Sequence, residues 1–577
     1  MDTPRWNSEV DAIVVGSGAA GMTAALTAHT EGLQVLLVEK TGRIGGSTAI
    51  SGGALWLPLN DQSAAAGHPD TYEQVWAYLE QTVGDAAPAA LKRAYLEAAP
   101  RVLRYLAGHG LLEAVARRAS PDYYPDRPGA ALGGRSLDPA EFDGRRLGRR
   151  RFRELRDPLP EFLVLGGMMV SVADVRHLLN ATRKFESWRH AMKLVLRYGA
   201  DRLRGYHRGT RLLLGNALAG QLFHALLQRQ VPYWLDTPAV ALHRDADGRA
   251  TGLTVRRAGR PWHVRARRGI VLATGGFPWD RARRAQAYPQ PTGAWSMAPQ
   301  GNTGDGIRLA LEAGATLGPR PASPAFWAPV SILARPDGSQ VRYPHLVWDR
   351  AKPGLIAVNG AGRRFVNESA SYHEFVLAMY RSHRETPSIP AFLICDRQFI
   401  DTWGLGLALP GGRPRRHLIE SGYLHEAATL AELAARLKLP ADALQDTVAR
   451  YNAHASQGID PDFGKGGTAY NRYLGDPDHR PNPCLAPLGA GPYYAVQVVA
   501  GDIGTAWGLA TDEHARILDR HGAPIDGLYA AGNDMHSVMG GAYPGPGITL
   551  GPALTFGWLA ARHLAGASPA TLPEETA

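Results

Sequence analysis

Apolar and polar positions near the start of the chain predict strands that alternate with a helix. Val10–Val15 is a short apolar run of the kind found in a strand buried within a sheet. Met22–Thr30 has the composition of a helix, and Gln34–Val38 is a second apolar run that ends at the acidic residue Glu39. Strand, helix and strand in this order predict a β-α-β unit and hence a parallel sheet.

A glycine-rich turn joins the first predicted strand to the helix. Gly16 allows a tight turn, Gly18 allows the close approach of a pyrophosphate, and Gly21 allows the helix to pack on the strand. The free N–H groups at the start of the helix add a partial positive charge that favours phosphates. Glu39 is placed to accept the ribose hydroxyls of an adenosine. The unit therefore predicts a dinucleotide site, for either NAD or FAD.

Three further segments favour FAD. Residues 45–53 combine glycines with small hydroxyl side chains, residues 269–276 are a strand that runs into glycines, and residues 527–533 are a strand that ends in Gly-Asn. Together they resemble the fumarate reductase and 3-ketosteroid dehydrogenase group of flavoproteins, in which the corresponding segments contact FAD. Residues 302–307 match a flavin-side motif of the same group.

The resemblance implies an α/β fold in which a discontinuous, Rossmann-like FAD-binding domain carries an inserted α+β catalytic domain. It also implies non-covalent FAD, because Gly46-Ser47-Thr48 replaces the histidine-bearing stretch that holds covalent flavin in succinate dehydrogenases. No metal ligands are expected. The residues that the resemblance assigns to cofactor binding are Gly16, Ser17, Gly18, Ala19, Ala20, Gly21, Glu39, Lys40, Gly46, Ser47, Thr48, Ser51, Gly52, Gly53, Val240, Ala273, Thr274, Gly275, Asp305, Gly532, Asn533, Thr549 and Leu550.

These assignments divide the chain into five segments. We expect the FAD-binding domain to consist of residues 8–125, 211–320 and 502–577, and the catalytic domain to consist of residues 321–501. The flavin is then expected at the floor of a cleft between the two domains. Residues 126–210 are a basic insertion of different character.

The basic insertion contains a candidate amphipathic helix. Residues 183–211 carry nine lysines or arginines against two acids. This segment either docks on the body of the protein with a solvated basic face or lies in the headgroup layer of an acidic membrane. Nucleic acid binding is not expected, since no recognition motif is present. Its interleaved apolar residues are Phe185, Trp188, Met192, Val195 and Leu196.

Composition bears on location and partners. The formal net charge is +10, which favours anionic surfaces or ligands. The two cysteines, Cys395 and Cys484, are too few for a disulfide framework and lack the spacing of a metal site. No apolar run is long enough to cross a membrane, and the first residues lack the layout of a signal peptide. We expect a cytoplasmic protein, with contact to the inner face of the cell membrane as one option for the insertion.

Candidate chemistry appears near the carboxyl terminus. Residues 540–553 form a Pro-Gly-rich turn that leads into an apolar helix, Ala553–Leu564. The N–H groups of this turn can stabilise negative charge on a substrate oxygen. The run from Tyr543 to Gly547 resembles a motif of 3-ketosteroid Δ1-dehydrogenases, in which the tyrosine hydroxyl and the last glycine N–H hold the carbonyl at carbon 3 of the steroid. The match assigns Tyr543 and Gly547 to an oxyanion pair.

A second match points to the base. Residues 363–368 are similar to a run in soluble fumarate reductases, which place a proton-donating arginine four positions after its glutamate. Tyr372 stands at that position here, as a tyrosine does in Δ1-dehydrogenases. A dicarboxylate substrate needs guanidinium groups, whereas a neutral ketone needs a base without a fixed positive charge. The resemblance therefore assigns proton abstraction to Tyr372.

A third tyrosine is expected beside this base. Residues 121–129 resemble a loop in which one tyrosine hydrogen-bonds the base, and Tyr123 aligns better than Tyr124. A free tyrosine has a pKa of about 10. The neighbouring hydroxyl and local charge must therefore lower the pKa of Tyr372 if it is to act at neutral pH.

The predicted activity is FAD-dependent 1,2-desaturation of a 3-ketosteroid, with the proton on carbon 2 taken by Tyr372 and the hydride on carbon 1 taken by flavin N5. Two alternatives stay open. One is a dehydrogenase that forms the double bond between carbons 4 and 5 of 5α-reduced 3-ketosteroids, and the other is an electron-transfer flavoprotein. The electron acceptor, quinone-like or other, the preferred steroid and the oligomeric state are not fixed by the sequence.

Overall fold

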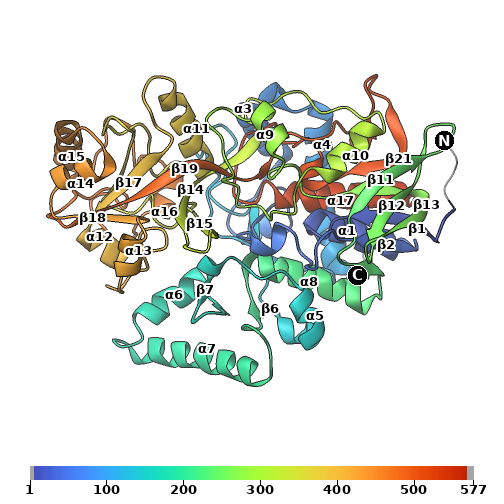
Figure 1. Cartoon of the computed structure of the whole chain (residues 1–577), viewed down its shortest axis with the longest axis horizontal. Helices are drawn as coiled ribbons and strands as arrows, with labels where there is room; N and C mark the ends of the chain where they lie inside the picture. The colour runs from blue at the N-terminus through green and yellow to red at the C-terminus, as the bar shows by residue number, and fades with distance from the viewer. Residues whose placement is uncertain (1–4, 568–577) are drawn as a thin grey trace.

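The computed structural model describes residues 5–567, which form two large β-sheets with helices packed around them (Figure 1). The sheet at the right of Figure 1 has the strand order β10-β2-β1-β13-β12-β11, with β21 paired to β13 and β20 paired to β21. Its strands are β1 (Ser8–Val15), β2 (Val35–Val38), β10 (Tyr233–Trp234), β11 (Ala239–Arg244), β12 (Ala250–Arg257), β13 (Arg260–Leu272), β20 (Arg516–Leu518) and β21 (Pro524–Ala530).

Parallel pairing brings four strand ends to one edge of this sheet. β1 pairs in parallel with β2 and β13, and β13 pairs in parallel with β21. Val15 is therefore in register with Val38 and Leu272, and Leu272 is in register with Ala530. The carboxyl ends of strands are where open α/β sheets bind ligands. The residues that directly follow these ends are Gly16, Glu39, Ala273 and Ala531.

Helix α1 (Ala19–Thr30) is fixed by close packing against the carboxyl-terminal helix α17 (Leu550–Leu564). Gly557 permits this approach, because a Cβ atom there would lie 2.5 Å from the Ala20 carbonyl oxygen. The same contact places the starts of both helices at the edge where the strands end. Helices α4 (Ala89–Gly108) and α8 (Leu214–Gln228) pack against this pair.

The sheet at the left of Figure 1 is antiparallel, with the order β15-β14-β19-β17-β16 and β18 paired to β19. Helix α11 (Tyr372–His383) packs on β14, and α14 packs on β18. The strands are β14 (Ala325–Ala334), β15 (Gln340–Pro344), β16 (Leu355–Val358), β17 (Ala391–Asp396), β18 (Leu424–Ala427) and β19 (Tyr493–Thr505), and the other helices are α12 (Arg397–Thr402), α13 (Arg416–Glu420), α14 (Leu430–Leu437), α15 (Ala441–Ala455) and α16 (Ala469–Leu474).

Shorter elements complete the body. They include a three-stranded sheet of β3 (Leu55–Trp56), β5 (Ser136–Pro139) and β4 (Ala114–Ala116), and the pair β7 (Leu163–Val164) and β8 (Met168–Met169). The remaining helices are α2 (Gln62–Ala65), α3 (Tyr72–Thr82), α5 (Gly148–Glu154), α9 (Arg281–Ala287) and α10 (Asp305–Glu312).

The basic insertion forms an arm that projects below the two sheets in Figure 1. Its helices α6 (Val172–Leu179) and α7 (Phe185–Leu203) pack against each other. Helix α7 is shorter than the segment 183–211 that the sequence suggested. It ends at Leu203 because Gly205 adopts a left-handed φ of +82° and closes the helix end. Arg211 instead begins the short strand β9 (Arg211–Leu212), which pairs with β6 (Phe142–Asp143).

The α/β fold expected from the sequence is confirmed, and its predicted elements shift by a few residues. α1 begins at Ala19 rather than Met22, because Gly18 is the residue that precedes the first helical turn. The strands of the right-hand sheet lie within residues 8–125, 211–320 and 502–577, whereas β19 crosses the predicted boundary between residues 501 and 502. The exact domain limits stay a prediction. None of the helices in residues 5–567 combines the length and apolar character that crossing a bilayer requires.

Candidate active site

The glycine turn after β1 leaves no room for side chains. Gly16 has a φ of +105°, and a Cβ atom there would lie 2.2 Å from the Ala273 carbonyl oxygen. α1 starts without a side-chain cap from Gly18. The Ala19 N–H donates to Thr48 Oγ1 at 2.9 Å, whereas the N–H groups of Ala20 and Gly21 donate to no protein group within residues 5–567. The turn therefore presents backbone donors to a phosphate.

Glu39 is held rigidly at the neighbouring strand end. The Ser17 N–H and Oγ donate to one carboxylate oxygen at 3.1 and 2.6 Å, and the Thr41 N–H and Oγ1 donate to the other at 2.9 Å each. Each carboxylate oxygen offers two lone pairs. Ser17 and Thr41 occupy all four lone pairs, so a ribose hydroxyl in the adjoining cavity would have to displace one of the two side-chain hydroxyls from the carboxylate.

A large cavity runs along these strand ends and continues toward the second sheet. All predicted cofactor-binding and catalytic residues line it except Gly21 and Val240. Gly21 instead packs against the turn, because a Cβ atom there would lie 1.9 Å from the Gly16 carbonyl oxygen. Near Val240 the lining side chains are Thr237 and Ala239, since successive side chains on a strand point to opposite faces.

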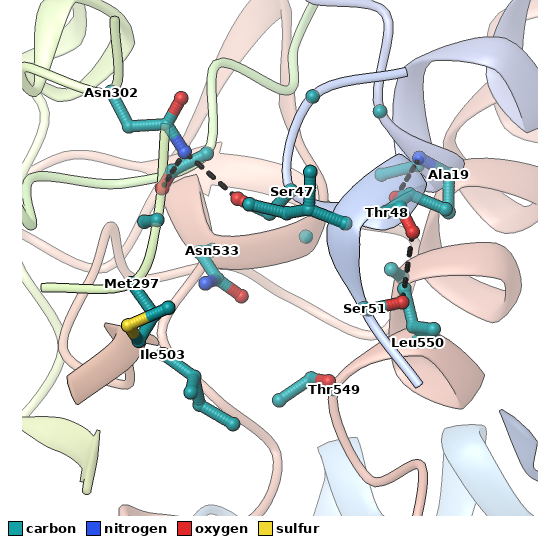
Figure 2. Close-up of a pocket in the computed structure, with 18 of the residues that line it drawn as sticks. Ala19, Ser47, Thr48, Ser51, Met297, Asn302, Ile503, Asn533, Thr549 and Leu550 are labelled. Atoms are coloured by element: carbon teal, nitrogen blue, oxygen red, sulfur yellow. Dashed lines mark hydrogen bonds between the residues drawn. The ribbon is translucent and has the colours of Figure 1, made fainter. Parts of the chain in front are cut away.

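Figure 2 shows the middle of this cavity. Asn302 Nδ2 donates to Ser47 Oγ at 3.1 Å and to the Gly275 carbonyl at 3.3 Å, which ties the two glycine loops together. Asn533, Met297 and Ile503 lie around the same hollow. The hollow thus combines an amide with apolar walls, which suits a planar, partly polar ring such as a flavin.

Asp534 is a supporting residue that sequence reasoning missed. It is fully buried, and it accepts hydrogen bonds from the Thr274 N–H at 2.5 Å, the Thr274 Oγ1 at 2.8 Å and the Gly276 N–H at 2.9 Å. Burial raises the pKa of Asp534. The loop after β13 is therefore fastened to the loop after β21. The sequence signal was an acid directly after Gly532-Asn533.

Three tyrosine rings from distant segments meet at the far end of the cavity. The hydroxyl of Tyr123 donates to that of Tyr372 at 3.1 Å. The Tyr543 ring stacks on Tyr123 at 5.4 Å between centroids and meets Tyr372 edge-on at 5.1 Å. All three side chains are buried and line the cavity. The structure thus brings the three predicted tyrosines together around one small volume.

Backbone contacts fix the relative positions of these tyrosines. The Tyr123 N–H donates to the Pro544 carbonyl at 2.8 Å, and the Tyr78 hydroxyl donates to the same oxygen at 2.6 Å. Tyr372 is the first residue of α11, whose N-cap Ser371 accepts from the Glu374 N–H at 3.2 Å. Tyr372 is therefore placed at the positive end of a helix.

Tyr124 does not contact Tyr372. Its hydroxyl donates to Glu374 Oε1 at 2.8 Å and so points away from Tyr372. Of the two tyrosines left open by the sequence, Tyr123 is the one that contacts Tyr372.

Gly547 presents a backbone donor beside Tyr543. Its φ is +100°, and a Cβ atom would lie 2.5 Å from the Ala54 carbonyl oxygen and 2.5 Å from the Trp56 nitrogen. Within residues 5–567 its N–H donates to no protein group, and the residue lines the cavity. Only glycine fits here, and the N–H is available to a substrate oxygen.

Burial dominates the electrostatics of this end of the cavity. It raises the pKa of Tyr372, Tyr123 and Tyr543 above the ordinary value of a tyrosine. Burial also lowers the pKa of His373 to about 3, so this histidine is neutral and its Nδ1 accepts from the Trp327 N–H at 3.2 Å. The phenols are therefore protonated in the resting site unless a positive charge stabilises their ionised form.

Several lining residues were not predicted. Apolar side chains surround the approach to the tyrosines, and two arginines also line the cavity, Arg117 directly after β4 and Arg156 shortly after α5. Arg117 is paired with Asp138, with Nε to Oδ2 at 2.9 Å. The unpredicted residues include Arg117, Arg156, Leu159, Phe162, Met297, Pro344, Leu346, Val347 and Ile503. They lie in segments without a local motif, so only the folded chain brings them together.

Comparison with known proteins identifies the family. Residues 11–550 match the model of the FAD binding domain family. The chain is 39% identical to a 4-oxocyclohex-2-ene-1-carboxylate 5-dehydrogenase of Sinomonas cyclohexanicum, over 96% of this chain and 93% of that protein. It is 38% identical to a 3-oxosteroid 1-dehydrogenase of Mycobacterium tuberculosis, over 96% of this chain and 98% of that protein. The chain belongs to this family of FAD-binding dehydrogenases.

A solved structure supports the same family assignment. The crystal structure of a 3-ketosteroid Δ1-dehydrogenase from Sterolibacterium denitrificans, in complex with 1,4-androstadiene-3,17-dione, is 41% identical and superposes with a TM-score of 0.90, covering 97% of this chain and all of that one. The predicted cofactor is thereby confirmed as FAD, and the protein is an FAD-dependent oxidoreductase. A pure electron-transfer role does not fit this membership.

Proposed function

We propose that this protein desaturates 3-ketosteroids between carbons 1 and 2. The observation that carries the proposal is the convergence of Tyr123, Tyr372 and Tyr543 with the free N–H of Gly547 at the end of an apolar cavity. Carbon 2 and the carbon 3 oxygen of such a substrate are close neighbours. A base and an oxyanion donor must therefore lie as close together as Tyr372 and Tyr543 do.

The proposed mechanism assigns one task to each group. The Tyr543 hydroxyl and the Gly547 N–H hold the carbon 3 oxygen and stabilise the negative charge that develops on it. Tyr372 takes the proton from carbon 2, and Tyr123 stabilises the ionised form of Tyr372 through its hydrogen bond. FAD, when bound, supplies the acceptor of the hydride from carbon 1. The buried site excludes water from the activated substrate.

Apolar residues favour a steroid over a small charged ketone. Phe162, Leu346 and Ile503 are among the side chains that line the approach to the tyrosines. The relatives of Sinomonas cyclohexanicum act on 4-oxocyclohexane carboxylates, as their names state, and Arg117 would be the group to bind such a carboxylate here. Asp138 already holds Arg117 in a two-pronged ion pair, with Nη2 to Oδ1 at 2.5 Å. Arg117 therefore offers little net charge to a second carboxylate, and we rank this activity second.

The third possibility, desaturation between carbons 4 and 5, finds less support. The 3-ketosteroid Δ4-(5α)-dehydrogenase of Rhodococcus jostii is 23% identical with a TM-score of 0.64, which bears on the fold alone. The contact of Tyr123 with Tyr372 favours carbon 2 as the site of proton abstraction, since the resemblance ties that tyrosine pair to the Δ1 reaction.

Anaerobic mixing tests the three activities directly. We expect androst-4-ene-3,17-dione to bleach the flavin absorbance of the purified holoenzyme after anaerobic mixing, with 1,4-androstadiene-3,17-dione as the product. Bleaching by 4-oxocyclohexanecarboxylate alone would establish the second activity. Bleaching by a 5α-saturated 3-ketosteroid with formation of the 4-ene product would establish the third.

We further propose that the arm contacts an acidic membrane surface. One face of α7 is buried inside the arm and includes Ser187, Ala191 and Leu194. A stripe of apolar side chains on another face of α7 is exposed to solvent. Basic residues flank that stripe, as in helices that lie in the headgroup layer. The exposed residues are Phe185, Trp188, Leu196 and Leu203. A membrane would supply both the hydrophobic substrate and a quinone-like electron acceptor.

Vesicle sedimentation tests this contact. We expect the protein to sediment with vesicles that contain anionic phospholipid more than with zwitterionic vesicles, and to be released by salt. Trp188→Ser with Leu196→Ser should abolish sedimentation. Leu409→Ser is the matched control, because Leu409 is equally exposed but lies outside the arm. Equal sedimentation of all three proteins would contradict the proposal.

A further inference from the structure

Tyr470 is a fourth buried phenol next to the three of the site. It lies on α16, and its ring centroid is 4.6 Å from that of Tyr123. The side chain is buried, with 2% of its surface exposed. Its hydroxyl interacts with Tyr123 but makes no well-aligned hydrogen bond to any group in residues 5–567. A buried hydroxyl without a settled partner is costly, so its position behind Tyr123 calls for an explanation.

Arg350 is a buried cation beside Tyr470 and Tyr123. It interacts electrostatically with both, and 2% of its surface is exposed. Its guanidinium donates only to backbone carbonyls, namely to His345 at 2.8 Å, Leu346 at 2.7 Å, Glu368 at 2.8 Å and Ala370 at 3.0 Å. No carboxylate in residues 5–567 forms an ion pair with it.

The nearby acids are engaged elsewhere. Asp349 accepts from His345 Nδ1 at 2.5 Å, and Glu368 accepts from Arg364 Nε and Nη2 at 2.8 Å each. The guanidinium of Arg350 is therefore bonded to carbonyl dipoles, and Asp349 and Glu368 act on it only through space. Such a charge in a low-dielectric interior favours an anion in its vicinity.

The other groups around Tyr123 supply no comparable charge. Tyr372 and Tyr543 are neutral hydroxyls in the resting site, since burial raises the pKa of both. Arg117 also interacts with Tyr123, but Asp138 neutralises it. Tyr473 on α16 is a half-exposed phenol near Arg117. Among the described residues, Arg350 thus interacts with both Tyr470 and Tyr123 and forms no ion pair with a carboxylate.

We propose that Tyr470 and Arg350 are positioning residues of the base, and that they complete a Tyr372–Tyr123–Tyr470 cluster which carries one negative charge in its active form. The proposal rests on the proposed desaturation. In this active form the Tyr470 hydroxyl turns to donate to Tyr123, Tyr123 donates to Tyr372, and Arg350 balances the charge. When Tyr372 takes the proton from carbon 2, the cluster becomes neutral. It returns to the active form by losing one proton to solvent before the next substrate is processed.

Arg350 also orders the segment that leads to the base. Its bonds to the Glu368 and Ala370 carbonyls hold the residues just before the N-cap of α11, where Tyr372 is the first helical residue. Substitution of Arg350 therefore changes both charge and geometry. Tyr470→Phe changes only a hydroxyl, so it is the decisive variant.

The experiment measures the pH dependence of flavin reduction by androst-4-ene-3,17-dione in the anaerobic holoenzyme. We expect the pKa of the essential base to rise by about one unit in Tyr470→Phe, with an approximately tenfold slower reduction at neutral pH that is recovered at alkaline pH. Flavin content and the affinity for the steroid should not change. Tyr451→Phe is the matched control, because Tyr451 is also buried with an unpartnered hydroxyl but lies in the separate core around α15.

Further outcomes distinguish the possible failures. An unchanged pH profile in Tyr470→Phe, with wild-type reduction intact, would overturn the cluster and leave the proposed function standing. A wild-type enzyme that no 3-ketosteroid reduces would remove the proposed function and the cluster with it. Arg350→Lys should retain more activity than Arg350→Gln at equal flavin content, because it keeps the charge. Equal loss in both would reduce Arg350 to a structural role and would also count against the cluster.

Discussion

The hydroxyl of Tyr123 lies 3.1 Å from that of Tyr372, although the two residues are 249 positions apart in the chain. Tyr123 belongs to the loop between β4 and β5 of the small sheet, and Tyr372 begins a helix that packs on the antiparallel large sheet. The contact therefore joins the small sheet to the antiparallel sheet. The hydrogen bond between Tyr123 and Tyr372 depends on how their two segments pack, so the pKa of Tyr372 is a property of the folded chain.

Removing the hydroxyl of Tyr372 should nearly abolish turnover. Tyr372→Phe eliminates the proposed base while keeping the buried ring, so we expect flavin reduction by androst-4-ene-3,17-dione to slow by about two to four powers of ten. Stopped-flow absorbance of the flavin measures this rate. Tyr380→Phe on the same helix is the control, since its hydroxyl has no partner in residues 5–567. Reduction at the wild-type rate would exclude Tyr372 as the base.

Loss of the oxyanion donor should have a different signature. In Tyr543→Phe the base is intact, but the substrate oxygen keeps only the Gly547 N–H. We expect the limiting rate of flavin reduction to fall by about two to three powers of ten, with the pH profile of the base retained. A parallel loss of steroid affinity, measured by perturbation of the flavin spectrum on binding, is expected to be smaller. If only affinity fell, Tyr543 would be a binding residue without a role in the transition state.

The fold was largely predictable from the sequence because its signals are local. The turn from Gly16 to Gly21, the acid Glu39 and the glycine exits of two later strands are each readable within a few residues. Parallel register then places these strand ends at one edge without further information. The tyrosines were found through resemblance to known motifs, and the structure decides between Tyr123 and Tyr124 by their contacts.

The rest of the site could not be predicted, because it depends on tertiary packing. Phe162 and Ile503 carry no motif, and each reaches the cavity only through the arrangement of its element. Asp534 does not line the cavity, and its role is visible only in its buried hydrogen bonds to the Thr274 loop. Arg350 also carries no motif, because its hydrogen bonds to the Glu368 and Ala370 carbonyls form only in the folded chain. The predicted length of α7 was too great, because the basic pattern of the sequence continues to Arg211. The helix itself ends at Leu203, before Gly205.

The rate of flavin reduction should rise with pH. Burial raises the pKa of Tyr372 above that of a free tyrosine, and the base acts only when it has lost its proton. Below this pKa the active fraction grows about tenfold per pH unit. Rapid mixing of holoenzyme and steroid across the stable pH range measures the slope. A rate that stays constant from neutral to alkaline pH would show that proton abstraction by a phenol does not limit reduction.

Asp534 should be required for retention of the cofactor. Its carboxylate fastens the Thr274 loop to the Asn533 loop through buried hydrogen bonds. Asp534→Ala leaves those donors unpaired at a cost of about 1–3 kcal/mol. We expect purified Asp534→Ala to carry less FAD and to bind added FAD at least about tenfold more weakly, since 1.4 kcal/mol corresponds to a factor of ten. Flavin content measured against protein absorbance tests this. Asp526→Ala, an exposed acid on β21, is the control.

The arm should loosen at low pH through Asp174. This buried carboxylate accepts from Arg211 Nη1 at 2.6 Å, from His190 Nε2 at 2.7 Å and from the Ser171 N–H at 2.8 Å, and these contacts hold its pKa at about 2. Because the folded pKa is depressed, the stabilisation is fully present above about pH 4 and is lost as the pH falls toward 2. Asp174→Asn removes it at every pH, with an expected loss of about 1–2 kcal/mol of local stability. Hydrogen exchange of α6 and α7 should therefore be faster in Asp174→Asn than in wild type at neutral pH, and the two should converge near pH 2. Flavin reduction by the steroid should be unaffected, because the arm contributes no tyrosine of the site. Equal exchange at neutral pH would mean that Asp174 does not hold the arm in place.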